Sequence, residues 1–272
     1  MLNTYKNEHR HAVTSLSLNL GVSPSVIGTT LRETDVNAWN QLSRDTFSIG
    51  EFTVNRVLSS LPDEDFARLL PHLQLLNIDS GENIYHSGDT GNYIYFPETA
   101  VFSQINVLED GRTVETAMIG NDGILGISAI LSCEQNSAPW TQTIISGTVY
   151  RINASTFKRE FSSNNFIHSS FLEYLNLYIN QVSQKVVCNN HHLIEERFST
   201  WLLMLDDRCG KDGLPLTHEQ IAHFLGVHRP SVTCIAQDLR KKGIINYSRG
   251  RIKILDRFKL EISACECYSV VN

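Results

Sequence analysis

The apolar positions between residues 214 and 243 predict two short helices separated by a tight turn. The first helix is expected over His218–Leu225, with Thr217 as its N-cap, because a threonine hydroxyl can accept a free backbone N–H of the first turn. Gly226 follows, and glycine tolerates the positive φ that a tight exit from a helix requires. The second helix is expected to begin near Arg229-Pro230, since proline is tolerated in a first turn.

Each of these helices has one apolar face and one polar face. Apolar residues line the inner faces at helical spacing: Ile221, Ala222, Leu225, Val232, Ile235, Ala236 and Leu239. Small Ala222, Gly226 and β-branched Val232 together are typical of a helix-turn-helix, whose second helix enters the major groove of DNA. An ordinary packed helical hairpin is the alternative. The predicted DNA-binding residues of this unit are Thr217, His228, Arg229, Pro230, Ser231, Thr233, Gln237 and Arg240.

A small β-hairpin is expected directly after the second helix, over the strands 244–247 and 252–255. A turn over 248–251 joins them and carries Arg249 and Arg251, which are predicted to reach DNA phosphates as a wing. Residues 217–259 hold nine Lys and Arg against three Asp and Glu, a net charge of +6. The whole chain is −6, so the remainder carries −12. This basic segment favours a polyanionic partner, double-stranded DNA, over a protein partner for the hairpin.

Short β segments alternate with glycine-containing polar turns between about residues 72 and 155. Many short strands at near-regular spacing predict a sandwich or a double-sheet jelly roll. A cupin-like metal enzyme is the alternative for such a fold, but no His-x-His with a nearby carboxylate occurs among these segments. The expected strands are Ile84-Tyr85, 93–96, Val101–Val107, Thr113–Ile119 and 141–152.

A long helix with a heptad pattern is expected next. Its apolar residues are spaced 3, 4, 3 and 4 positions apart, which is the seam of a coiled coil. We interpret the seam as a dimer interface, because the flanking domains leave little for it to pack against within one chain. A following helix, His192–Asp206, should anchor the DNA-binding unit. The predicted dimer-interface residues are Leu172, Leu175, Ile179, Val182 and Val186.

These elements predict an α+β protein with four parts. Residues 1–48, which hold 17 Ser, Thr or Asn, are expected to form a poorly ordered N-terminal arm. A jelly-roll sensor domain (49–163), a dimerisation helix (164–190) and a winged helix-turn-helix domain (191–272) follow. The chain has no apolar run of about 18 residues and no basic segment followed by an apolar core at its start, so a cytoplasmic protein without membrane contact is expected.

The six cysteines form no Cys-x-x-Cys pair and are expected to be reduced thiols. Cys265 and Cys267 could bind a metal or oxidise, but we interpret them as reduced thiols of a C-terminal tail and predict no metal site. His218 and His223 superficially resemble a zinc-protease motif. They are five residues apart, about 140° around a helix, so they cannot hold one ion on one face. No catalytic residues, and hence no enzyme, are predicted.

A jelly roll, a long dimer helix and a winged helix-turn-helix, in this order, resemble the Crp/Fnr family of bacterial transcription regulators. The resemblance covers roughly residues 55–259 and is most specific in Gly81-Glu82, Gly88-Asp89 and 216–243. It implies a homodimer that reads a two-fold-related operator through recognition helices spaced about one turn of DNA. It also implies RNA polymerase as a partner. The operator, and whether the protein activates or represses, stay open.

The resemblance places an effector pocket in the jelly roll. Cyclic-AMP-binding members carry a Gly-Glu pair and, about ten residues later, an Arg-Ser/Thr-Ala triplet; here Ile127 replaces the Glu and Ser137 the Arg. A buried phosphate without a cation is costly, so an unidentified small-molecule effector is expected, with a cyclic nucleotide in an atypical pocket as the alternative. No cysteine precedes Cys133, so the family's N-terminal iron–sulfur cluster, and any other cofactor, is not expected. The predicted pocket residues are Gly126, Ile127, Ser128, Ser137 and Ala138.

Overall fold

The structure is a computed structural model and describes residues 52–86, 91–131, 139–209 and 213–271. The expected N-terminal arm (1–48) lies outside these ranges, as do Gly88-Asp89 and the predicted pocket residues Ser137 and Ala138. Within the described ranges, no helix is long and apolar enough to cross a membrane.

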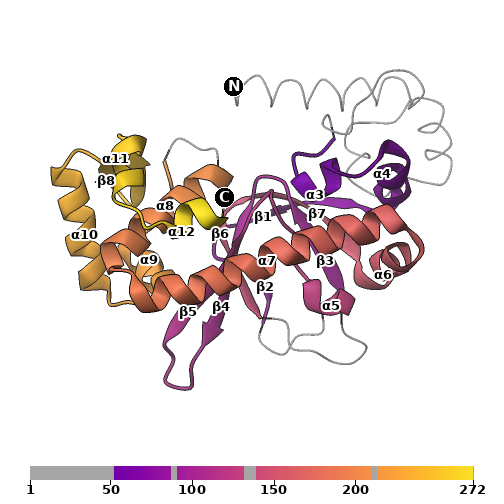
Figure 1. The fold of residues 1–272 in the computed structure, drawn as a ribbon, viewed down its shortest axis with the longest axis horizontal. Helices are drawn as coiled ribbons and strands as arrows, with labels where there is room; N and C mark the ends of the chain where they lie inside the picture. Colours follow the sequence, from indigo (N-terminus) through magenta and orange to yellow (C-terminus); the bar gives the residue numbers. More distant parts are fainter. Residues whose placement is uncertain (1–51, 87–90, 132–138, 210–212, 272) are drawn as a thin grey trace.

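The β-rich half is a sandwich of two antiparallel sheets, which confirms the predicted fold class (Figure 1). One sheet has the order β1-β7-β3 and the other the order β2-β6-β4-β5. Side chains from both sheets fill the space between them. The strands are β1 Gln74–Ile78, β2 Asn83–Tyr85, β3 Tyr93–Pro97, β4 Val101–Val107, β5 Thr113–Ile119, β6 Trp140–Ile145 and β7 Gly147–Asn153.

The expected single strand over 141–152 was wrong, because the chain changes sheets at Gly147. A Cβ at Gly147 would overlap the backbone of Thr99 and Ala100. Only glycine permits that approach, and it lets the chain leave the four-stranded sheet as β6 and enter the other as β7. By contrast, the expected strands Val101–Val107 and Thr113–Ile119 are confirmed as β4 and β5, which pair as an antiparallel hairpin with Gly111 at a φ of 82° in its turn.

Several short helices frame the sandwich and were not expected from the sequence. Apolar side chains of these helices pack with β3 and with the long helix in one core cluster, which includes Phe66, Phe96, Phe157 and Phe171. They are α3 Arg56–Ser59, α4 Asp63–Leu69, the 3₁₀ helix η2 Leu70–His72, α5 Ile127–Leu131 and α6 Ala154–Ser163.

The long helix α7 spans Asn165–His191 and crosses the molecule from α6 to the C-terminal helices (Figure 1). The Asn164 side chain caps its start by accepting two backbone N–H groups. One face packs on the sandwich, where the Tyr174 hydroxyl donates to the Ile124 carbonyl at 2.8 Å. The opposite face is open: Leu172, Ile179 and Val186 of the predicted seam are 44%, 55% and 60% exposed.

The C-terminal part contains two of the predicted helices in their predicted places. α9 spans His218–Leu225 and α10 spans Arg229–Lys241, while α8, Ile194–Cys209, begins and ends slightly later than expected. β8 Ile245–Ser248 and β9 Arg251–Ile254 pair as an antiparallel hairpin. Two further helices, α11 Arg257–Ile262 and α12 Cys267–Val271, were not expected.

One hydrophobic core cluster joins the sandwich to the C-terminal part. Val101, Ile105 and Met118 of β4 and β5 lie in the same cluster as Phe198 and Trp201 of α8. The C-terminal part is therefore packed against the four-stranded sheet rather than tethered beside it.

Candidate nucleic-acid interface

The turn between α9 and α10 has the geometry that the sequence predicts. The Thr217 hydroxyl accepts the N–H of Gln220, and the Gln220 side chain accepts the N–H of Thr217, which completes a capping box. Gly226 ends α9 in the left-handed region, with φ 65° and ψ 39°. Pro230 lies in the first turn of α10. Local residue chemistry thus fixes the angle at which α10 is presented.

The outward face of α10 is polar, and most of the predicted contact residues lie on it. Arg229 pairs only loosely with Glu219, its Nε lying 3.7 Å from Oε2, and both side chains are well exposed. Such an exposed pair contributes little to stability and leaves the guanidinium free to exchange partners. The exposed predicted residues are Thr217, His228, Arg229, Pro230, Gln237, Arg240, Arg249 and Arg251, whereas Ser231 and Thr233 are half-buried.

The hydroxyl of Thr233 is engaged within the protein. It donates to the Arg229 carbonyl at 3.1 Å, so it accepts from His218 Nδ1 at 3.0 Å. The His218 ring stacks on Tyr247 of β8, with ring centroids 4.2 Å apart. Burial, together with the charge of Arg229, lowers the pKa of His218 and keeps the ring neutral. His218 therefore links α9, α10 and the wing, and sequence reasoning missed this role.

The wing turn is shorter than predicted. Ser248 pairs directly with Arg251, so the loop has two residues, Arg249 and Gly250, rather than four. Both have positive φ, 50° and 72°, as a tight hairpin with the right-handed twist of its strands requires. Among the residues that the structure describes, Arg249 is the one non-glycine with positive φ. The chain thus holds a charged side chain at a position that favours glycine or asparagine.

Contacts from the start of β5 reach the first helix of the DNA-binding unit. The Thr113 hydroxyl donates to the His223 carbonyl at 2.9 Å and accepts from His223 Nδ1 at 2.9 Å. A Cβ at Gly226 would lie 3.0 Å from the Thr113 carbonyl. The β4–β5 hairpin therefore contacts both α9 and the turn that positions α10.

The backbone is closely packed at Gly126, one of the predicted pocket residues that the structure describes. Gly126 has a φ of 92°, and a Cβ there would lie 2.7 Å from the Tyr85 hydroxyl and 2.8 Å from the Tyr93 carbonyl. Ile127 and Ser128 form the start of α5. Tyr85 donates to the Tyr93 carbonyl and packs edge-on against Tyr95. Aromatic rings thus occupy the space beside the predicted pocket residues.

A large cleft lies elsewhere, along α7. It encloses about 690 Å³ and is lined by residues of α3, α7 and the C-terminal segment, together with Asp122 and Gly123. Arg208 donates to Asp122 in its wall, with Nη2 to Oδ2 at 2.6 Å. None of Gly126, Ile127 and Ser128 lines it.

Four potential metal ligands also meet near the end of α7: Cys188, His192, Cys265 and Cys267. The sequence interpretation treated the last two as tail thiols, but the structure buries both against α7 and α8. The signal available in the sequence was the pair of spacings, Cys-x₃-His on a helix and Cys-x-Cys near the C-terminus, and neither pair makes a site alone.

Known domain families match the sandwich and the C-terminal part of the molecule separately. Residues 196–262 match the Crp-like helix-turn-helix domain. Residues 75–164 match the cyclic nucleotide-binding domain.

Curated relatives and solved structures are similar over most of the chain. The Global nitrogen regulator of Synechococcus elongatus is 20% identical over 195 residues, which cover 68% of this chain and 86% of that protein. The Anaerobic regulatory protein of Bacillus subtilis is 21% identical over 194 residues, covering 68% of this chain and 82% of that protein. The structure of FixK2 from Bradyrhizobium japonicum superposes with a TM-score of 0.61 at 18% identity, covering 71% of this chain and 98% of that chain.

Proposed function

We propose that this chain, which belongs to the Crp/Fnr family of DNA-binding transcription regulators, acts as a homodimer that reads a two-fold-related operator. Membership of this family identifies the chain as a DNA-binding transcription regulator. The dimer, the residue roles and the effector are our proposals.

The arrangement of the wing against α9 carries the proposal for DNA docking. A Cβ at Gly250 would lie 4.0 Å from the Thr217 side chain, so the wing tip lies next to the start of α9. This closeness supports Thr217, Arg249 and Arg251 as one group of phosphate contacts that positions the unit. Arg229, at the start of α10, then reads a guanine through its O6 and N7 atoms.

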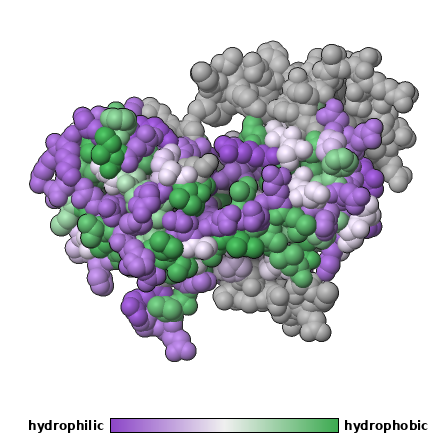
Figure 2. Space-filling model, in the orientation of Figure 1, coloured by the Kyte–Doolittle hydropathy of each residue, from purple (hydrophilic) through white to green (hydrophobic). Residues whose placement is uncertain are grey.

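The open face of α7 supports the homodimer. Leu172, Ile179 and Val186 would be an unusual solvent-facing row in a monomer, because they recur at heptad spacing on one face of a 27-residue helix. Figure 2 shows hydrophobic side chains along the course of α7 on the face viewed. Leu175 and Val182, the intervening seam residues, are half-buried and complete the row. A second copy of α7 would cover it and bring two α10 helices to one side.

The filled space beside Gly126 supports a sensor that does not take cyclic AMP in the usual way. The three atoms that lie closest to a Cβ at Gly126 belong to Tyr85, Tyr93 and Ile94, and none of them is a cation that could pair with a cyclic phosphate. We infer an unidentified small-molecule effector and RNA polymerase as further partners, and a cytoplasmic site of action, where the DNA is. An atypical cyclic-nucleotide pocket is the competing hypothesis.

Selection of bound duplexes from a random pool, with and without cyclic nucleotides or a metabolite extract, tests the proposal. A two-fold-related consensus containing a guanine in each half-site is expected. A single asymmetric half-site would contradict the homodimer, and enrichment that depends on a cyclic nucleotide would favour the competing sensor hypothesis.

A further inference from the structure

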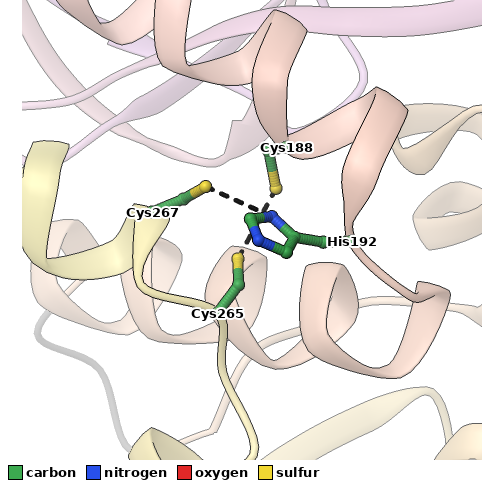
Figure 3. A group of neighbouring side chains, drawn as sticks. All are labelled: Cys188, His192, Cys265 and Cys267. Atoms are coloured by element: carbon green, nitrogen blue, oxygen red, sulfur yellow. Dashed lines mark hydrogen bonds between the residues drawn. The ribbon is translucent and has the colours of Figure 1, made fainter.

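Three cysteines and a histidine converge at the junction of α7, α8 and α12 (Figure 3). Cys188 lies in the last turn of α7 and His192 is the C-cap of that helix. Cys265 lies just before α12, and Cys267 is the first residue of that helix. The sulfur atoms and one imidazole nitrogen all lie within 4.8 Å of one another. The three thiols are buried and not in disulfides, and the histidine side chain is 13% exposed.

We propose that Cys188, His192, Cys265 and Cys267 bind a single transition-metal ion, Zn²⁺ first of all, in a closed structural site. Three thiolates and one imidazole form a standard donor set for structural zinc. A tetrahedral ion with Zn–S near 2.3 Å and Zn–N near 2.0–2.1 Å sets its ligands about 3.8 Å (S···S) and about 3.5 Å (S···N) apart. Cys188 Sγ lies 3.6 Å from Cys265 Sγ, and Cys267 Sγ lies 3.4 Å from His192 Nδ1. Both distances fit the edges of that tetrahedron.

The imidazole of His192 is oriented as a ligand. Its Nε2 lies 3.2 Å from Oε2 of Glu266, and its Nδ1 faces the thiols. A carboxylate on Nε2 holds the proton there and leaves the Nδ1 lone pair for the ion. Metal-bound histidines usually have such a partner on the other ring nitrogen.

Hydrogen-bond donors surround the sulfur atoms. Gln184 Nε2 donates to Cys267 Sγ at 3.0 Å. The Thr200 hydroxyl accepts the backbone N–H of Cys265 at 3.1 Å and lies 3.1 Å from Cys265 Sγ, where it has a proton to donate to a thiolate. Arg197 lines the same small cavity as Cys188 and Cys267. A zinc ion with three thiolates carries a net charge of −1, and this guanidinium and these donors offset it.

Other chemistries explain fewer of these contacts. A Cys188–Cys265 disulfide would leave Cys267 and the oriented His192 without a role. In an iron–sulfur cluster the four ligands are divided among two or four iron atoms, so the ligand atoms are spread more widely than around one ion. One ion in the middle accounts for all four side chains. It would tie α12 to the end of α7 and to α8, so its binding energy would stabilise the junction between the long helix and the DNA-binding unit.

Metal titration of the reduced, chelator-stripped full-length protein tests the site. We expect one Zn²⁺ per chain, a higher melting temperature with Zn²⁺ than without it, and, with Co²⁺, the visible bands of a tetrahedral ion plus thiolate charge transfer. Cys188→Ser and Cys267→Ser should each weaken Zn²⁺ binding by about 100-fold or more in competition with a chromophoric chelator. Glu266→Gln should weaken it by about 10–100-fold.

Two cysteines outside the group provide matched controls. Cys209 is buried and Cys234 is exposed, and neither is among the four residues that converge. Cys209→Ser and Cys234→Ser should therefore keep the stoichiometry and affinity of the wild-type chain. Because Glu266 is exposed, Glu266→Gln remains informative if a cysteine variant fails to fold.

Three results would overturn the site. One is absence of Zn²⁺ uptake by the reduced protein. Another is a Co²⁺ spectrum without thiolate charge transfer. The third is equal Zn²⁺ affinity in Glu266→Gln and the wild-type chain together with unchanged binding in Cys267→Ser.

Discussion

The indole nitrogen of Trp201 donates to both carboxylate oxygens of Glu115, at 3.0 and 3.1 Å, across 86 positions of sequence. Lys185 Nζ lies 3.0 Å from the same carboxylate, and the Ser103 hydroxyl donates to it at 2.8 Å. Glu115 is 1% exposed. One buried charge thus holds β4, β5, α7 and α8 together.

Removing that carboxylate should destabilise the protein strongly. Glu115→Ala leaves the Lys185 ammonium and the Trp201 N–H without their partner, so we expect the unfolding free energy to fall by about 3–5 kcal/mol in urea denaturation. Asp110→Ala is the control, because Asp110 pairs with Arg112 in an exposed turn and should give no measurable change. Equal losses of unfolding free energy in the two variants would show that the buried Glu115 contacts stabilise the protein no more than an exposed ion pair does.

Arg229 should control base readout. Arg229→Ala is expected to lower the preference for the selected operator over a scrambled duplex by about 1–3 kcal/mol, since a bidentate contact to guanine is lost. Fluorescence anisotropy with both duplexes measures this difference. Glu219→Gln, which removes only the loose partner of Arg229, should keep the preference. Unchanged specificity in Arg229→Ala would refute the proposed docking of α10.

Arg249 at the wing tip should lower the stability of the fold and raise the affinity for DNA. Arg249→Gly removes a phosphate contact and also relieves a left-handed residue, so the folded state should gain about 1 kcal/mol while all duplexes bind more weakly. The slope of log K against log salt should flatten by about one unit. Arg56→Ala, in α3, serves as the charge control. A loss confined to one operator sequence would instead mean that the wing reads bases.

The seam of α7 should govern assembly. Ile179→Glu places two carboxylates at the centre of an apolar interface, so the dimer should lose several kcal/mol and sediment as a monomer. Tight operator binding should be lost, and weak non-specific binding kept through the basic unit. Asn180→Glu adds the same charge about 100° around the helix and should leave the dimer intact. A dimeric, operator-competent Ile179→Glu protein would place the contact elsewhere.

The contact between β5 and α9 should weaken in acid. Burial lowers the pKa of His223 below its ordinary value of 6.5, so the unfolded chain takes up a proton at a higher pH than the folded chain. The contribution of the neutral His223 side chain to the unfolding free energy is complete above pH 6.5. It is lost as the pH falls through the pKa of His223 in the folded state. When the pH is lowered from about 7.5 to about 5.5, the melting temperature of His223→Gln should therefore fall less than that of the wild-type chain. Buried Glu98, with its pKa raised to about 7, acts oppositely in both proteins and cancels in the comparison.

The DNA-binding unit could be predicted closely because its signals are local. A threonine cap, a left-handed glycine and a proline in a first turn act within a few residues of where they stand, and Thr217, Gly226 and Pro230 occupy those positions. The heptad spacing of α7 is equally local, although spacing alone does not say what covers the seam.

The cysteine–histidine group could not be predicted in this way. Cys188 and Cys265 are 77 positions apart, and only the docking of the C-terminal segment on α7 and α8 brings them within 3.6 Å. The close packing around Gly126 could not be predicted for the same reason. Nothing near Gly126 in the sequence indicates that the Tyr85 side chain occupies the space beside it.

The continuous core between β4, β5 and α8 also limits how such a gene can recombine. A chimaera that joins this sandwich to another regulator's DNA-binding unit would set foreign side chains against Val101, Ile105 and Met118, where Phe198 and Trp201 now pack. The two halves look separable along the sequence, yet their side chains pack together in one hydrophobic core. Substitutions on one side of that boundary must be matched on the other, so the halves should be inherited as a unit.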